Sequence, residues 1–328
     1  MAAQRRGPAL AAEGAAPGGG ISGRRRALGL AAGLLILVFL ALGAYAGWDK
    51  VDDFEWHVDP AAAAAGFAAL FGMYVTNALG YVLIIEQLAG RRVPRRRFAA
   101  VWARSLLGRY VPGNVVMVAS RLVLGQEAGI SRKVSLAASV YEQALSLGAA
   151  SAGGLLLLAA YGAGEIGAAA WLVALVPAGL VVLHPSLFGR VTAWLLRRVK
   201  REPLEALLTG RQVLGLLAWY LLGAVLLALG IGLLVYSAVG DDGGSLLYVG
   251  LSFLTSFVVS MLAFIFPSGL GLREGAFALA LGRNLPGGVA IALSAGTRLA
   301  LTLAELVFVG AAVLVDQAGR RADAIKPK

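Results

Sequence analysis

The stretch Pro267-Ser-Gly-Leu-Gly-Leu-Arg-Glu-Gly275 interrupts a long apolar run with helix-breaking residues and two charges. A related stretch, Gly108-Arg-Tyr-Val-Pro-Gly113, interrupts an earlier apolar run. After each motif, an ionisable residue lies inside the next apolar stretch: Glu142 follows Pro112 by 30 residues, and Arg298 follows Pro267 by 31. Helix breakers followed by an intramembrane charge, in both halves of one chain, predict a transport site within a membrane.

The composition around these motifs is that of a membrane protein. Hydrophobic residues make up 59% of the 328-residue chain and charged residues only 14%, which is too apolar for an ordinary soluble domain. The chain has no cysteine and two histidines, so we expect no disulfide, no metal site and no cofactor. The net charge of +11 comes from basic residues beside apolar runs, which favours a membrane surface over nucleic acid as the partner.

Six apolar runs are long enough, or nearly so, to cross the roughly 30 Å of hydrocarbon as helices. The predicted crossings are Ala27–Gly47, Ala61–Ile85, Val134–Tyr161, Ala168–His184, Val213–Val239 and Val289–Val315. Basic residues cluster at 24–26, 91–97 and 190–201, and acidic residues at 49–59 and 241–242. Because cytoplasmic loops are enriched in Lys and Arg, this pattern and the even number of crossings predict that both termini are cytoplasmic.

Two stretches that contain the motifs, 98–129 and 246–286, remain outside these crossings. We predict an all-α polytopic membrane protein with about six full transmembrane helices and two Pro/Gly-broken re-entrant hairpins, which enter from opposite sides in an inverted repeat. One alternative is that Leu246–Phe266 spans the membrane alone. The predicted divisions are a disordered tail (1–22), a first repeat (23–161), a second repeat (162–316) and a cytoplasmic tail (317–328).

The predicted hairpins should bring charged residues and glycines to the centre of the bundle. Half-helix N-termini there offer free N–H groups and partial positive charge, which suit an anionic group such as phosphate. The candidate substrate-binding residues are Arg109, Gly113, Glu142, Gly269, Gly271, Arg273, Glu274, Arg298 and Glu305. We predict no catalytic residue among them.

Each charged candidate has an alternative, purely structural interpretation. Glu142 could bind substrate or be a structural partner for an arginine of the bundle, and because it matches Arg298 in the repeat these two residues could pair directly. Glu305 shares a helix face with Arg298 and could act in substrate binding or only in packing. Arg273 and Glu274 are placed to bind a head group or to form a simple salt bridge. Three arginines of the first hairpin could line a basic vestibule or extend to the interface: Arg104, Arg109 and Arg121.

Taken together, the two motifs and Glu142-Gln143 resemble the transmembrane flippase-like domain of lysylphosphatidylglycerol synthases and its stand-alone relatives. The resemblance covers residues 27–316 and implies translocation of a lipid or lipid-linked head group. The family's separate cytosolic aminoacyl-transferase domain has no counterpart among the remaining residues, so we expect no enzyme activity of that kind.

Two classes of function follow from these observations. The first is a flippase that moves an anionic or aminoacylated phospholipid, or an isoprenoid-linked lipid, between the leaflets of a prokaryotic cell membrane, alone or as a homo-oligomer. The second is a membrane-embedded enzyme or accessory subunit acting on lipid-linked sugars, with Glu142 or Glu274 as a base. Such an enzyme would need an additional carboxylate cluster on the cytoplasmic face, for which Glu202 and Glu205 are the candidate pair.

Overall fold

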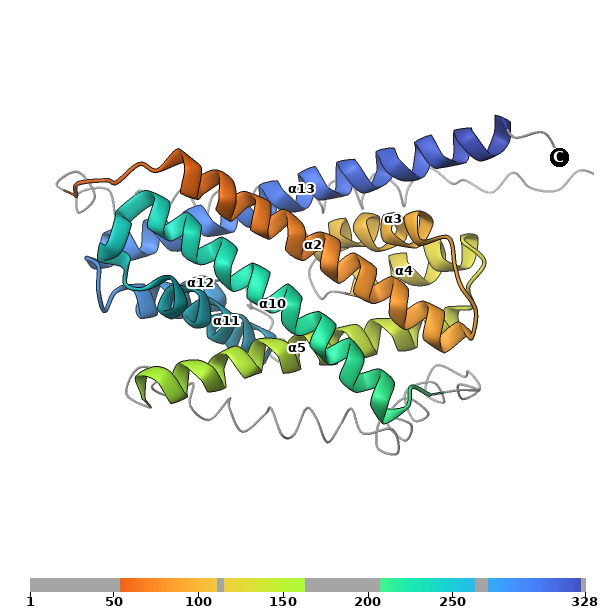
Figure 1. The fold of residues 1–328 in the computed structure, drawn as a ribbon, viewed down its shortest axis with the longest axis horizontal. Helices are drawn as coiled ribbons and strands as arrows, with labels where there is room; N and C mark the ends of the chain where they lie inside the picture. Colours follow the sequence, from red (N-terminus) through yellow and green to blue (C-terminus); the bar gives the residue numbers. More distant parts are fainter. Residues whose placement is uncertain (1–53, 111–114, 163–206, 263–270, 326–328) are drawn as a thin grey trace, which may run out of the picture.

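The computed structural model describes residues 54–110, 115–162, 207–262 and 271–325, and every regular element in these ranges is a helix (Figure 1). In chain order the elements are α2 (Pro60–Ala89), α3 (Arg95–Leu106), the 3-10 helix η2 (Leu107–Tyr110), α4 (Val115–Glu127), α5 (Arg132–Tyr161), α10 (Gly210–Val239), the 3-10 helix η4 (Gly240–Gly243), α11 (Leu246–Leu262), α12 (Leu272–Leu281) and α13 (Gly287–Ile325). The predicted all-α membrane fold is confirmed.

Four described helices are long and apolar enough to cross a membrane, namely α2, α5, α10 and α13. Each coincides with one of the six predicted crossings. The other two, Ala27–Gly47 and Ala168–His184, lie outside the described residues, as does the predicted tail at 1–22. The chain is therefore a multi-pass membrane protein.

Local capping interactions fix where α2 and α10 begin. The Asp59 carboxylate accepts hydrogen bonds from the backbone N–H groups of Ala61 and Ala62, at 2.9 and 3.0 Å. Thr209 and Gln212 form a capping box at the start of α10. These side chains satisfy N–H groups that the first helical turn leaves without intrahelical partners, and both helices then run for 30 residues.

Helices α2 and α10 form the central contact between the two halves and run antiparallel (Figure 1). Near the start of α2, Gly66 lies against Gly230 near the end of α10, while Gly80 lies against Tyr220 near the start of α10. A Cβ atom at Gly66 would come within 2.9 Å of the Gly230 carbonyl oxygen, so glycine permits this close crossing. Equivalent helices that run in opposite directions are what an inverted repeat requires.

Each half also contains a pair of short helices at the position of the predicted hairpin. Helices α3 and α4 lie at the right end of the view in Figure 1, and α11 and α12 lie at the left end. With 12, 13, 17 and 10 residues, these four helices are shorter than the about 20 residues that a full crossing needs. Their opposite placement agrees with the prediction, and their re-entry into a bilayer stays a prediction.

The two hairpins contact the long helices of the opposite half along two seams of different chemistry. Helix α11 packs on α5, where a methyl group at Gly153 would strike Leu254 and Gly154 faces Thr255. We call this contact the glycine seam. Helix α3 with η2 packs on α13 through three ion pairs, Arg96–Asp323, Arg104–Asp316 and Arg109–Glu305. We call this contact the ionic seam.

Helix α13 extends past the predicted crossing Val289–Val315 and into the predicted cytoplasmic tail, 317–328. Helix α13 continues through this region to Ile325, so it has 39 residues and a length of about 58 Å. The Arg96–Asp323 pair attaches its last turns to the start of α3. Asp316 and Arg320 are also bonded four residues apart on this helix, at 2.8 Å.

Candidate functional site

A fully buried ion pair joins the first hairpin to α5. The side chains of Arg121 on α4 and Glu142 on α5 are hydrogen-bonded to each other through both guanidinium Nη atoms. Arg121 Nε donates to Ser105 Oγ at 2.9 Å, and Trp102 Nε1 donates to Glu142 Oε1 at 2.7 Å. Arg121 is 0% exposed and also lies over the Tyr81 ring, so both charges are enclosed and bonded.

The predicted direct pairing of Glu142 with Arg298 is therefore wrong. Arg298 lies instead near Glu274, with Nη1 3.6 Å from Oε1. Each half holds its own pair of opposite charges, one on a hairpin helix and one on the following long helix. The signs are exchanged, because the first half has its cation on the hairpin and the second half has its anion there. Arg121 was missed as a partner, although its place in the first hairpin parallels that of Glu274 in the second.

Two arginines converge on Glu274 at the N-terminal end of α12, and we call Arg273, Glu274 and Arg298 the triad. Arg273 Nη2 donates to Glu274 Oε1 at 2.8 Å, and Arg298 approaches the same oxygen. These side chains are 13, 19 and 24% exposed, respectively, so the triad is less enclosed than the Arg121–Glu142 pair. Gly271 caps the helix with a φ of 99°, a left-handed conformation that favours glycine.

Glu305 forms a second polar centre two helical turns from Arg298 along α13. Its Oε2 atom accepts hydrogen bonds from Arg109 Nη1 at 2.9 Å and from the Tyr74 hydroxyl at 3.2 Å. The Tyr74 hydroxyl also lies 3.2 Å from the Leu301 carbonyl oxygen. The side chain of Glu305 is 2% exposed, and its Oε1 atom has no hydrogen-bond partner within the described part of the chain.

The three arginines proposed for a basic vestibule do not form one. Each lies against a carboxylate on a long helix: Arg104 near Asp316 at 3.8 Å, Arg109 with Glu305, and Arg121 with Glu142. Asp316 is 1% exposed and was not predicted as part of the site. These pairs account for the arginines as partners of buried acids, which is the usual arrangement of charges at membrane depth.

Aromatic side chains connect the buried pair to Glu305. Trp102, which donates to Glu142, contacts the ring of Phe308 edge-on with centroids 5.8 Å apart. Phe308 in turn stacks on Tyr74, which donates to Glu305. Arg298, Glu305 and Asp316 are spaced by 7 and 11 residues on α13, so they share one face over about 27 Å of helix. This face confirms the predicted alignment of Arg298 with Glu305.

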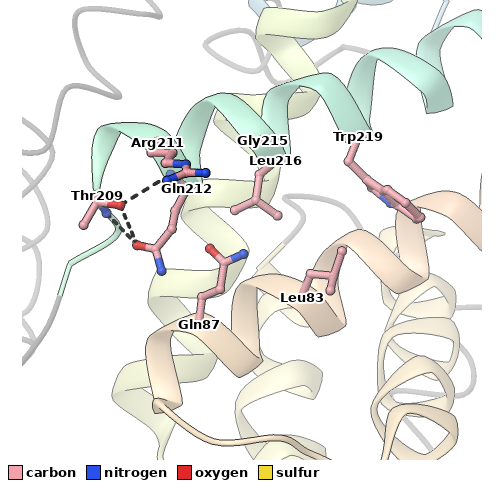
Figure 2. Close-up of a pocket in the computed structure, with 8 residues that line it drawn as sticks. All are labelled: Leu83, Gln87, Thr209, Arg211, Gln212, Gly215, Leu216 and Trp219. Carbon is pink, nitrogen blue, oxygen red and sulfur yellow. Dashed lines mark hydrogen bonds between the residues drawn. The ribbon is translucent and has the colours of Figure 1, made fainter.

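Several predicted features lie outside this polar arrangement. Gly113, Gly269 and the pair Glu202 and Glu205 lie outside the described residues. A pocket of about 470 Å³ opens between the end of α2 and the start of α10, and Figure 2 shows its lining side chains, which include Gln87 and Gln212. No candidate residue from the sequence lines it. Within the described ranges, no group of three His, Asp or Glu side chains is positioned to hold a metal ion.

The fold and the site together define a polytopic membrane protein with paired charges inside its helical bundle. The profile of the lysylphosphatidylglycerol synthase TM region matches residues 26–309. The chain belongs to this family, which confirms the resemblance inferred from the two motifs. No curated protein gave a significant match to the sequence.

Proposed function

We propose that this protein moves a phospholipid with an anionic or aminoacylated head group, or a lipid-linked head group, between the leaflets of a prokaryotic cell membrane. The protein acts as a translocator and makes no covalent change to its cargo. Both termini lie in the cytoplasm, so the hairpin α3–α4 faces the cytoplasmic leaflet and α11–α12 faces the outer one. Membership of a membrane family named for a lipid synthase supports a lipid as the cargo.

The net charge of the triad carries this proposal. Two guanidinium groups and one carboxylate leave one uncompensated positive charge at the N-terminal end of α12. A helix N-terminus adds partial positive charge, and a partly exposed cation within a membrane protein favours an anionic ligand such as a phosphodiester. The fully enclosed Arg121–Glu142 pair has no net charge and serves as a fixed support for the first hairpin.

Removing either arginine of the triad should slow lipid exchange. We expect Arg273→Ala and Arg298→Ala to lower the rate about tenfold or more, because a hydrogen bond to a charged group is worth roughly 1.5–3 kcal/mol. The measurement is loss of accessible fluorescence from labelled phosphatidylglycerol, phosphatidylcholine and an isoprenoid phosphate in proteoliposomes. Arg92→Ala, at an exposed position between α2 and α3, is the matched control and should exchange lipid like the wild type.

Two results would contradict the proposal. One is wild-type exchange no faster than in protein-free liposomes for all three lipids. The other is equal exchange by the triad variants and the Arg92→Ala control, provided that all variants insert and retain the wild-type thermal stability. A faster rate for the isoprenoid phosphate than for either phospholipid would assign the lipid-linked cargo.

A further inference from the structure

The pocket between the end of α2 and the start of α10 is lined by polar groups that the triad and the ionic seam do not use. Its volume is about 470 Å³, within the roughly 300–1,000 Å³ that small-molecule sites occupy. Its described lining comes from α2, from α10 and from the cap residue Thr209, and no residue of the short hairpin helices is part of it. Figure 2 shows the carboxamides of Gln87 and Gln212 projecting into it from the two helices.

Gln87 contributes a hydrogen-bond acceptor to this pocket. Its Oε1 atom is buried and has no hydrogen-bond partner in the described part of the chain. A buried acceptor without a partner has lost the hydrogen bonds of water and gained none in return, so such an atom calls for a donor. A hydroxyl group of a bound molecule is one such donor.

Gln212 and Arg211 contribute the donors. The Oε1 atom of Gln212 accepts hydrogen bonds from Thr209 N and Oγ1, at 2.8 and 2.9 Å, so its orientation is fixed by the capping box. The two Nε2 hydrogens take no part in that box. Arg211 adds a guanidinium group, and the described lining residues include no carboxylate. Donors with a net positive charge favour an anion such as a phosphodiester.

The apolar part of the lining continues onto the outer surface of α10. The indole ring of Trp219 is held in position because its Nε1 donates to the Thr76 carbonyl oxygen at 2.8 Å. Spacings of four, four and three residues put four positions on one face of α10, namely Arg211, Gly215, Trp219 and Leu222. Leu222 is 47% exposed. This order of side chains fits an amphiphile, with a polar end at the start of the helix and an apolar end further along it.

Basic side chains surround this end of the molecule. Arg92 follows α2 and Arg132 begins α5, and both are exposed. Lysine and arginine beside membrane-spanning helices attract anionic lipids to the surface of the bilayer. A lipid source for the phosphodiester is therefore favoured over a soluble one.

We propose that this pocket is a resident-lipid site, which binds a phospholipid whose monoanionic phosphodiester carries a hydroxylated head group, as in phosphatidylglycerol. The phosphate contacts Arg211 and Gln212 Nε2, and a hydroxyl of the head group donates to Gln87 Oε1. The acyl chains lie along the face of α10 that includes Leu222. Such a lipid bridges α2 and α10 and stabilises the contact between the two halves. The site is separate from the triad and does not depend on translocation.

The choice of ligand tests the chemistry of the site. Protein stripped of lipid in a neutral detergent is titrated with phosphatidylglycerol, with phosphatidylpropanol, which has the same charge but no head-group hydroxyl, and with glycerol 3-phosphate, which has no acyl chains. The readout is the unfolding temperature, which a ligand that binds only the folded state raises by mass action. Phosphatidylglycerol should act at about tenfold lower concentration than phosphatidylpropanol, because the latter leaves the Gln87 acceptor unpaired. Glycerol 3-phosphate should have no effect at concentrations at which phosphatidylglycerol saturates.

Substitutions of the polar groups assign their roles. Arg211→Ala should weaken binding of both lipids about tenfold or more, because it removes a charge-assisted contact to the phosphate. Arg132→Ala, which removes an exposed arginine from the first turn of α5, is the matched control and should bind like the wild type. Gln87→Leu keeps the volume of the side chain but removes the acceptor, so the variant should bind the two lipids equally.

Gly215 allows a steric test of the location. It lines the pocket, and a Cβ atom at this position would have no atom within 4 Å. Gly215→Trp should therefore fill part of the pocket and abolish the stabilisation by phosphatidylglycerol. Gly310 on α13 has equally open surroundings, so Gly310→Trp is the matched control and should respond like the wild type. If Gly215→Trp fails to fold, the comparison of Arg211→Ala with Arg132→Ala decides the location.

Several results would overturn the resident-lipid site. Equal responses of each pocket variant and its matched control would mean that the lipid binds elsewhere. Equal affinity of the wild type for the two lipids would remove the hydroxyl from the assignment, and equal stabilisation by glycerol 3-phosphate would remove the lipid.

The triad variants separate this site from the proposed function. Arg273→Ala should keep the wild-type stabilisation by phosphatidylglycerol. Loss of that stabilisation in Arg273→Ala but not in Arg211→Ala would locate the lipid at the triad, which overturns the resident-lipid site and supports the proposed translocation. Stabilisation that depends on Arg211 in a protein that exchanges no lipid would support the resident-lipid site and contradict the proposed function.

Discussion

Replacing Glu142 by glutamine should lower the free energy of unfolding by about 3–5 kcal/mol, because the substitution leaves a buried guanidinium without its charge partner. Arg121 is 0% exposed, so water cannot take the place of the lost carboxylate. Arg121→Gln should have a similar effect by stranding the carboxylate. The measurement is thermal and denaturant-induced unfolding of the purified protein in detergent, followed by the loss of helical circular dichroism.

The double variant Arg121→Met with Glu142→Leu provides the internal control for this pair. Apolar side chains of similar volume remove both charges at once, so the double variant should be more stable than either single variant. Ser139→Ala removes a long contact, at 3.5 Å from Arg121 Nη1, and the hydrogen bond that the hydroxyl donates to the Ser135 carbonyl oxygen at 2.9 Å, and it should change stability by less than about 1.5 kcal/mol. Strictly additive losses in the double variant would contradict the direct pairing of Arg121 with Glu142.

Replacing Gly66 by alanine should destabilise the protein by about 1–3 kcal/mol, since it overpacks the crossing of α2 and α10. The new methyl group would lie 2.9 Å from the Gly230 carbonyl oxygen and 3.0 Å from Leu234 Cγ. A backbone oxygen cannot rotate away as a side chain can, so the two helices must separate. The shift in thermal unfolding temperature measures the effect.

Gly72 on the same helix supplies the matched control. The nearest atom to a Cβ at this position is Leu226 Cδ1 at 3.6 Å, which is an ordinary contact. Gly72→Ala should therefore be neutral or stabilise the helix by up to about 1 kcal/mol, because alanine has the higher helix propensity. Equal effects of the two substitutions would mean that α2 and α10 do not cross at Gly66.

The long helices and the positions of the hairpins could be predicted from the sequence because the signals are local. Continuous apolar runs predicted α2 and α10, and proline with glycine marked the breaks in each half. The same-face relation of Arg298 and Glu305 also followed from helical geometry alone. These features depend on the apolar interior of the membrane and on backbone hydrogen bonding within each helix. Neither depends on the tertiary contacts of the chain.

The partners of the charges could not be predicted, because they depend on which side of each hairpin faces which long helix. Glu142 and Arg298 do occupy matching positions, but each is satisfied within its own half by Arg121 and Glu274. Arg121 lies on a short helix, where its side chain could extend to the membrane interface or pair with a buried acid. Its sequence context does not decide between these two arrangements. The predicted last crossing ends at Val315, where the apolar run ends, whereas α13 continues to Ile325. Asp316 and Arg320 have the four-residue spacing of a helical ion pair.

The glycine seam and the ionic seam differ in what kind of change they can tolerate. At the glycine seam the constraint is volume, because Gly153 already lies against Leu254 and leaves no space for a larger group. At the ionic seam the constraint is charge balance, because Arg104 and Arg109 lie against buried acids. Substitutions that change charge are therefore expected to have their largest effects at the ionic seam, and substitutions that add volume at the glycine seam.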